Sequence, residues 1–286
     1  MAEKLTKNEK REAAREEARQ RREQEMKKAK KRKIFTRLGV LAGILLAIGI
    51  VVMIVVSGNK PAVAQANPKN MLSNGVLFDV TVKTPVETPA IAKGKEATPT
   101  EPSTDKVNVI IYLDYSCPYC KKFEASQSKI LADYVNKGEA TVEYHPLAFL
   151  TNYSVAAGNA SACVASKEPE KWWKVNEALF AAQPDEAVAG GWSQTSSINF
   201  VKDALKSYEL NSETKTCIKE TPYVEWLAKA TSEALSGPLP NSNAKKVEGT
   251  PFVLVDGNLY QVDYINDSEM LSKVIEEAKK VRSTIQ

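Results

Sequence analysis

Residues 107–120 read VNVIIYLDYSCPYC, an apolar run that leads into two cysteines, Cys117 and Cys120. The run predicts a buried β-strand over 107–114, because apolar and β-branched residues dominate a short segment. After the cysteines, the spacing of the side chains predicts a helix over 117–136, with one face formed by Phe123, Gln127, Ile130, Leu131 and Tyr134. The Cys-x-x-Cys motif therefore lies at the junction between a predicted strand and a predicted helix.

The start of a helix is a favourable place for thiol chemistry. Two cysteines three positions apart there lie one turn apart, and their Cα atoms can fall within the roughly 4.4–6.8 Å that a disulfide requires. Unpaired backbone N–H groups and the positive end of the helix dipole both favour a thiolate. Pro118 is compatible with this position because its missing N–H would have no helical partner. We interpret Cys117 and Cys120 as a catalytic pair that exchanges disulfides.

The formal net charge of +4 hides two segments of opposite sign. Residues 1–37 contain 15 Lys and Arg against 7 Glu, whereas the rest of the chain has 24 Lys and Arg against 28 Asp and Glu. An uncharged run of 19 residues, from Leu38 to Val56, follows the basic segment. At about 1.5 Å per residue, a helix of this length nearly crosses a hydrocarbon core of about 30 Å. The basic segment is therefore interpreted as the flank of a membrane segment, and no nucleic-acid partner is expected.

The one-sided distribution of Lys and Arg predicts how the chain is oriented. We expect a cytoplasmic basic tail at 1–37, a single transmembrane helix at 38–57 and an extracytoplasmic part after Gly58. A cleaved signal peptide is the alternative, since Ala62-Val63-Ala64 matches a cleavage pattern. The long charged region and the long apolar run favour an anchor retained in the cell membrane. Both interpretations predict export.

The exported part is predicted to be an α/β protein. Residues 59–105 are rich in proline and threonine and are typical of an extended polar spacer, although 75–80 has strand character. The region from 151 to 242 shows helical periodicity and is too long for a single crossover, so it is interpreted as an inserted helical subdomain. The other predicted elements are strands at 107–114, 139–147, 252–255 and 259–262, and helices at 117–136 and from about Ser268.

Four cysteines in an exported chain are readily oxidised, because disulfides persist outside the cytosol. Cys117 and Cys120 form one natural pair, which leaves Cys163 and Cys217 for a second, structural disulfide. A zinc site made of all four cysteines is the alternative, but such sites usually pair two close-spaced knuckles. We expect neither a metal nor a cofactor, and we interpret His145, the only histidine, as structural.

Taken in order along the chain, these signals resemble the DsbA-like thiol-disulfide oxidoreductases, especially the membrane-tethered ones of Gram-positive and actinobacterial cells. The resemblance covers roughly residues 70–286. It implies a thioredoxin fold with an inserted α-helical subdomain. The boundaries that follow are a linker at 58–69, the first part of the thioredoxin-like domain at 70–150, the helical subdomain at 151–242 and the second part at 243–286.

Gly249-Thr250-Pro251-Phe252 resembles the motif that precedes the last hairpin in this family. In the family the proline is cis and faces the two cysteines, and the residue before it pairs with the substrate through its backbone. The resemblance therefore implies that Pro251 is a cis-proline and that Thr250 contacts the substrate. The run from His145 to Leu150 likewise resembles the junction between strand and helical domain in the family.

Three residues near the cysteines bear on how acidic the thiols are. Many thioredoxin-fold enzymes carry a buried acid six residues before the first active cysteine, where this chain has Ile111. Asp114 resembles an acidic residue often seen in this subgroup, and it either tunes the thiols or caps the strand. Tyr119 occupies the place of the His in the best-known oxidants and cannot supply a positive charge. We interpret Pro118, Tyr119 and Asp114 as residues that modulate the active site.

These features predict an enzyme that introduces disulfides into exported proteins with reduced cysteines, through a mixed disulfide on Cys117. The resemblance implies reoxidation by a membrane partner of the DsbB or VKOR type. One alternative is a thiol reductase or isomerase for exported proteins, for example in cytochrome c maturation. Another is a membrane-tethered binding or chaperone module without redox turnover, which would tolerate the loss of Cys117.

Overall fold

The computed structural model describes residues 67–185, 189–260 and 269–285. Within these ranges, no helix is both long enough and apolar enough to cross a membrane. The predicted cytoplasmic tail at 1–37 and the predicted transmembrane helix at 38–57 lie outside the described residues, as does most of the predicted linker at 58–69.

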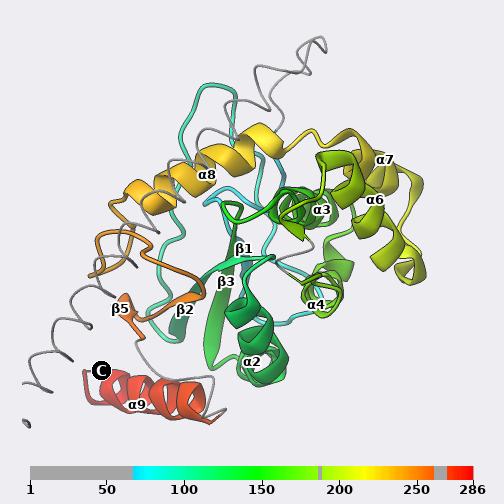
Figure 1. Cartoon of the computed structure of the whole chain (residues 1–286). Helices are drawn as coiled ribbons and strands as arrows, with labels where there is room; N and C mark the ends of the chain where they lie inside the picture. Colours follow the sequence, from blue (N-terminus) through cyan, green and yellow to red (C-terminus); the bar gives the residue numbers. More distant parts are fainter. Residues whose placement is uncertain (1–66, 186–188, 261–268, 286) are drawn as a thin grey trace, which may run out of the picture. The chain divides into compact units, whose positions relative to one another are not determined.

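The described residues fold around a mixed five-stranded sheet (Figure 1). In order across the sheet, its strands are β1 (Val76–Phe78), β3 (Ala140–Leu147), β2 (Val107–Asp114), β4 (Phe252–Val255) and β5 (Asn258–Leu259). β2 and β3 are parallel, and the other neighbouring strands are antiparallel. The apolar run identified in the sequence is thus the central strand, buried along most of its length.

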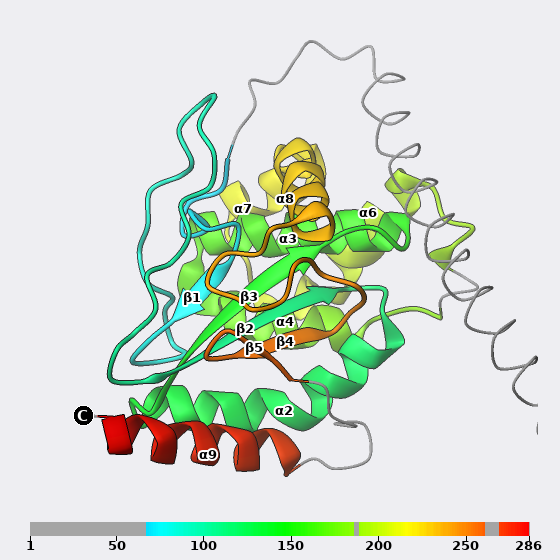
Figure 2. The same cartoon turned by 90° about the vertical axis from the view of Figure 1, so that its left-hand side faces the viewer.

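Helices cover both faces of the sheet (Figure 2). α2 (Pro118–Asn136) and α9 (Met270–Ile285) run side by side under one face, where the Tyr134 hydroxyl donates to the Glu276 carboxylate at 3.0 Å. α8 (Val224–Ser236) lies over the opposite face. Because successive strand residues point to opposite faces, β2 contributes Ile111 to the core that includes α2 and Tyr112 to the smaller core beneath α8.

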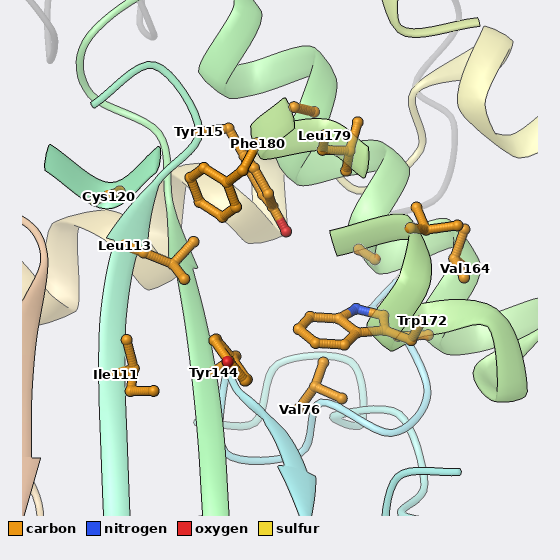
Figure 3. Packing of buried hydrophobic residues seen from close by; sticks show 14 of the residues in the cluster. Val76, Ile111, Leu113, Tyr115, Cys120, Tyr144, Val164, Trp172, Leu179 and Phe180 are labelled. Carbon is orange, nitrogen blue, oxygen red and sulfur yellow. The ribbon is translucent and has the colours of Figure 1, made fainter. Parts of the chain in front are cut away.

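The larger core lies between the sheet and the helices that follow β3. Figure 3 shows Ile111 and Leu113 of β2 pointing to the same side of the sheet as Tyr144 of β3, which faces Trp172. The rings of Tyr144 and Trp172 are 5.4 Å apart, and neither side chain is more than 1% exposed. Each buried aromatic side chain removes about 150–250 Å² from water, so these rings dominate the packing.

The region between β3 and β4 is helical, as predicted. α3 (Asn152–Lys167) is almost entirely buried, and its small residues allow close packing; a Cβ atom on Gly158 would lie 2.6 Å from the Leu227 side chain of α8. The helices that pack around α3 are α4 (Trp172–Ala181), α6 (Gln194–Ala204), α7 (Ser212–Glu220) and α8, with 3₁₀ turns at Pro169–Lys171 and Lys206–Tyr208.

Two parts of the structure differ from the prediction. The described part of the predicted spacer packs against the domain, because Met71 and Ile91 are buried and the Asn70 amide donates to the Ala165 carbonyl at 2.8 Å. Apolar residues scattered among the prolines provide this attachment. The second hairpin strand is Asn258–Leu259 rather than 259–262, and residues 261–262 lie outside the described residues.

Candidate active site

Cys117 and Cys120 lie at the N-terminus of α2, directly after β2. Cys117 is the N-cap with extended backbone, and Pro118 occupies the first helical position. The backbone N–H of Cys117 donates to the carbonyl of Asp114 at 2.9 Å, which closes the turn between strand and helix. Both thiols are free, and they are only 5% and 1% exposed. One short turn therefore presents two thiols, one of them nearer the surface.

The loop before β4 brings Thr250 and Pro251 against Cys117. The Thr250–Pro251 peptide bond is cis, as the resemblance implied. The Cys117 thiol donates to the Thr250 carbonyl at 3.1 Å. This proximity follows from the sheet, because β2 and β4 are neighbours and Tyr112 pairs with Phe252. The backbone of Thr250 thus lies where a peptide that approached Cys117 would meet it.

The two thiols differ in acidity. The pKa of Cys117 is lowered to about 7, because Cys120 donates a hydrogen bond to its sulfur and the side chain of Thr250 contributes another, against the opposing effect of burial. Burial raises the pKa of Cys120 well above its ordinary value, and the neighbouring Cys117 adds to this effect. Near neutral pH, Cys117 is therefore the more readily ionised of the two thiols.

Asp114 connects the end of β2 to the segment that enters the helical insertion. Its carboxylate accepts hydrogen bonds from the backbone N–H groups of Ser116 (2.8 Å), Phe149 (2.9 Å) and Leu150 (3.3 Å), and from the Ser154 hydroxyl (2.5 Å). Burial nevertheless raises the pKa of Asp114 to about 6, with these hydrogen bonds acting in the opposite direction. Its charge also raises the pKa of Cys117 slightly, as the last of several causes. Asp114 acts first as an organiser of backbone groups.

Tyr119, the third residue of the motif, faces solvent. Its side chain is 53% exposed, and the ammonium nitrogen of Lys122 lies 5.6 Å from the centre of its ring. Tyr119 therefore adds an exposed aromatic surface next to Cys117 and no charge. Leu150 is also an exposed apolar residue, and Thr151 beside it contacts Ser116 through their hydroxyl groups at 2.6 Å. Exposed apolar side chains thus lie both in the Cys-x-x-Cys motif and in the segment that contacts Ser116.

A buried acid that the sequence analysis did not single out lies on α2. Ile111 is fully buried and apolar, as its position suggested, whereas Glu124 is only 3% exposed. Burial raises the pKa of Glu124 to about 8, and the nearby Glu177 contributes. The Asn176 amide donates to Glu124 at 2.8 Å. Only the spacing of four residues from Cys120 on the buried face could have indicated it, since a glutamate on a helix is usually exposed.

His145 and two tryptophans that follow each other in the sequence, Trp172 and Trp173, are part of the packing. His145 lies 3.4 Å from the carboxylate of Glu143, which also accepts hydrogen bonds from Ser73 and Thr100. Burial opposes ionisation of Glu143, but His145 and these hydroxyl groups lower its pKa. The pair thus attaches the segment at 67–105 to β3. Trp172 and Trp173 are 1% and 7% exposed.

Cys163 and Cys217 form a disulfide with a Cα–Cα separation of 5.8 Å. The bond ties α3 to α7 and closes a loop with a sequence separation of 54. The four cysteines therefore form two separate pairs, and the second pair lies within the helical insertion. Among the described residues, no group of His, Cys, Asp and Glu could hold a metal ion.

The sequence matches the family described as Thioredoxin over residues 103–277, which is more than half of the chain, so the protein belongs to the thioredoxin family. The predicted fold, a thioredoxin fold with a helical insertion, is confirmed. The oxidised BdbD of Bacillus subtilis has a similar structure, with a TM-score of 0.51 and 19% identity over 76% of this chain and 98% of that one. The MdbA protein of Corynebacterium diphtheriae is also similar, with a TM-score of 0.50 and 18% identity over 76% of this chain and 96% of that one.

Sequence relatives point in the same direction. "Disulfide bond formation protein D" of Bacillus subtilis is 35% identical over 80 residues, which cover 28% of this chain and 36% of that protein. "Probable disulfide bond formation protein D" of Bacillus anthracis is 21% identical over 176 residues, or 61% of this chain and 74% of that protein. The first match thus spans little more than a third of its relative. Together these matches confirm the resemblance to DsbA-like oxidoreductases.

Proposed function

We propose that this chain is a thiol:disulfide oxidoreductase that introduces disulfides into exported proteins. The observation that carries the proposal is the contact between the acidified Cys117 thiol and the Thr250 carbonyl next to cis-Pro251. It combines an ionisable thiol, a buried partner thiol and a backbone acceptor in one place. The names of the two Bacillus relatives, which concern disulfide bond formation, support the assignment.

In the proposed reaction the enzyme begins with a Cys117–Cys120 disulfide. A substrate thiolate attacks the sulfur of Cys117, and the Cys120 sulfur leaves and takes up a proton, which its high pKa favours. A second substrate thiolate then attacks the substrate sulfur of the mixed disulfide and displaces Cys117 as a thiolate. The substrate gains a disulfide and loses two electrons, which remain in the enzyme dithiol. Stabilisation of the departing Cys117 thiolate drives this direction.

A reductase is the second candidate, because a Cys117 pKa of about 7 equals the thioredoxin value and lies above the roughly 3.5 of DsbA. The reduction potential of the purified full-length chain against glutathione distinguishes the two. We expect a potential nearer to the roughly −120 mV of DsbA than to the roughly −270 mV of thioredoxin. A thioredoxin-like potential, together with an oxidised form that is more stable than the reduced form, would establish the reductase.

The proposal includes a location and a reoxidant. We infer that residues 38–57 anchor the chain in the cell membrane with the redox domain outside, and that a DsbB- or VKOR-type protein reoxidises Cys117 and Cys120. The one-sided Lys and Arg distribution supports the anchor. The chain should remain with membranes after a carbonate wash and retain its own N-terminus. A soluble form that begins near Gln65 would instead show a cleaved signal.

A further inference from the structure

The C-terminal end of α4, in the helical insertion, contacts the active-site turn on both sides of Cys117. The side-chain amide of Gln183 donates to the carbonyls of Tyr115 at 2.6 Å and of Cys117 at 3.0 Å. In the reverse direction, the ammonium group of Lys121 donates to the carbonyls of Ala181 at 3.1 Å and of Gln183 at 3.4 Å. Residues before and after the motif are thus bonded to one helix end.

The end of α4 is itself held firmly. The Tyr115 hydroxyl donates to Asn176 of α4 at 2.7 Å, and the Tyr115 ring lies 4.7 Å from that of Phe180. The backbone N–H of Gln183 donates to the Phe180 carbonyl at 3.1 Å. Since Asn176 also donates to Glu124 of α2 at 2.8 Å, α4 is joined to the chain on both sides of the two cysteines. Gln183 therefore extends from a rigid support.

These bonds have a direct electrostatic consequence. The last carbonyls of a helix lack intrahelical partners and form the negative end of its dipole, so a cation such as Lys121 is stabilised there. The carbonyls of Tyr115 and Cys117 point their negative ends toward the Gln183 amide, which offsets part of their charge. A thiolate on Cys117 is then less opposed by the carbonyl groups of its own turn. Loss of the amide would leave the Tyr115 carbonyl without this donor, whereas the Cys117 carbonyl would still accept from the backbone N–H of Lys121 at 3.1 Å.

We propose that Gln183 and Lys121 are positioning residues through which the helical insertion stabilises the Cys117 thiolate. Neither residue touches the reacting sulfur atoms in the described contacts. Gln183 acts through the backbone of the active-site turn, and Lys121 holds the end of α4 from which Gln183 extends. The consequence for disulfide exchange rests on the proposed function, whereas the effect on the thiolate does not. The helical insertion would thus influence the redox centre as well as cover it.

The test is the pH dependence of iodoacetamide alkylation of Cys117 in the reduced full-length chain. Gln183→Ala should raise the pKa of Cys117 enough to reduce its thiolate fraction near neutral pH about threefold, the effect of one lost hydrogen bond. Gln183→Glu should have a larger effect, because its carboxylate would face two carbonyl oxygens. Lys121→Met should shift the pKa in the same direction, and Lys121→Arg, which keeps donors for the α4 carbonyls, should restore it.

Lys122→Met is the matched control, because Lys122 carries the same charge at the next position but contacts the Tyr119 ring instead of α4. An equal shift in Lys122→Met and Lys121→Met would mean that only charge matters and would overturn the role of Lys121. An unchanged Cys117 pKa in both Gln183 variants, with intact circular dichroism, would overturn the role of Gln183. A wild-type chain that fails to oxidise thiols would refute the proposed function without affecting these comparisons.

Discussion

The thiol of Cys117 and the backbone carbonyl of Thr250 lie 3.1 Å apart, although 133 positions separate them in the chain. The contact joins the start of α2 to the loop that precedes β4 across the central sheet. Cys117 is only 5% exposed at this contact. A substrate that pairs with the Thr250 backbone would therefore place its own cysteine next to Cys117.

Loss of the buried thiol should trap Cys117 in mixed disulfides. In Cys120→Ser, the Cys117 thiolate can still attack a disulfide of an exported protein and displace one of its sulfurs as a thiolate, but Cys120 is no longer present to attack the new bond and release Cys117. Non-reducing electrophoresis followed by reduction detects these mixed disulfides. Cys117→Ser should form none and should lose oxidase activity. Full activity in Cys117→Ser would support a binding module without redox turnover.

Ionisation of Cys117 should contribute stability to the reduced form as pH rises through the neutral range. The folded pKa of Cys117, about 7, is below the roughly 8.5 of an unfolded thiol. The stabilisation is therefore present above pH ~8.5 and is lost as pH falls through ~7, with a full size of up to about 2 kcal/mol. Urea unfolding of the reduced protein between these pH values measures it. The free energy of unfolding of the wild type minus that of Cys117→Ser should rise over this range, because Glu124 titrates in both proteins and cancels, and parallel curves would contradict the prediction.

The disulfide in the helical insertion should contribute to stability and not to turnover. Replacing both Cys163 and Cys217 with Ser should lower the free energy of unfolding by about 2–4 kcal/mol, because the closed loop restricts the unfolded chain. Thermal unfolding and oxidation of a reduced model peptide, measured on the same preparation, separate the two roles. A variant that unfolds like the wild type but is inactive would contradict the structural role.

Asp114→Asn should destabilise the protein by about 2–4 kcal/mol. The carboxylate accepts four hydrogen bonds, and an Asn amide would direct N–H groups at buried donors. Asp133→Asn, an exposed site on α2, is the control and should change stability little. Chemical denaturation of the two variants gives the comparison. Equal stability would mean that Asp114 does not organise the segment after β3.

Glu124→Gln should stabilise the protein at pH 8 and have little effect at pH 4. Burial raises the folded pKa of Glu124 to about 8, so the folded state binds a proton that the unfolded state releases above pH ~4.5. The stability that the folded state gains by keeping Glu124 protonated is fully present below pH ~4.5 and is lost as pH rises through ~8. The Gln side chain of the variant carries no charge and avoids this loss, so Glu124→Gln should raise the free energy of unfolding by about 1–3 kcal/mol at pH 8. Unfolding curves at both pH values test it, and an equal effect at the two would refute the assignment.

Local sequence patterns predicted the elements closest to the site. β2 has the predicted bounds at 107–114, and α2 begins within one residue of its predicted start. Both follow from short-range physics, since side-chain periodicity and the position of Pro118 act over a few residues. The prediction of an extended polar spacer at 59–105 was partly wrong, because the packing of its described part depends on residues far away in the sequence. Among residues 67–105 the prolines disfavour regular structure outside β1, but burial of Met71 and Ile91 depends on a surface that other segments form.

The chemical identity of the redox pair follows from the sequence, because two cysteines three positions apart after a strand can form a local disulfide without any distant residue. What makes the two thiols unequal required the folded chain. Burial raises the pKa of Cys120, the Thr250 side chain lowers the pKa of Cys117 from a distant loop, and the Gln183 amide reaches the turn from the end of a different helix. The pKa of each thiol depends on desolvation and on hydrogen bonds from neighbours in space, and local sequence patterns cannot predict those neighbours.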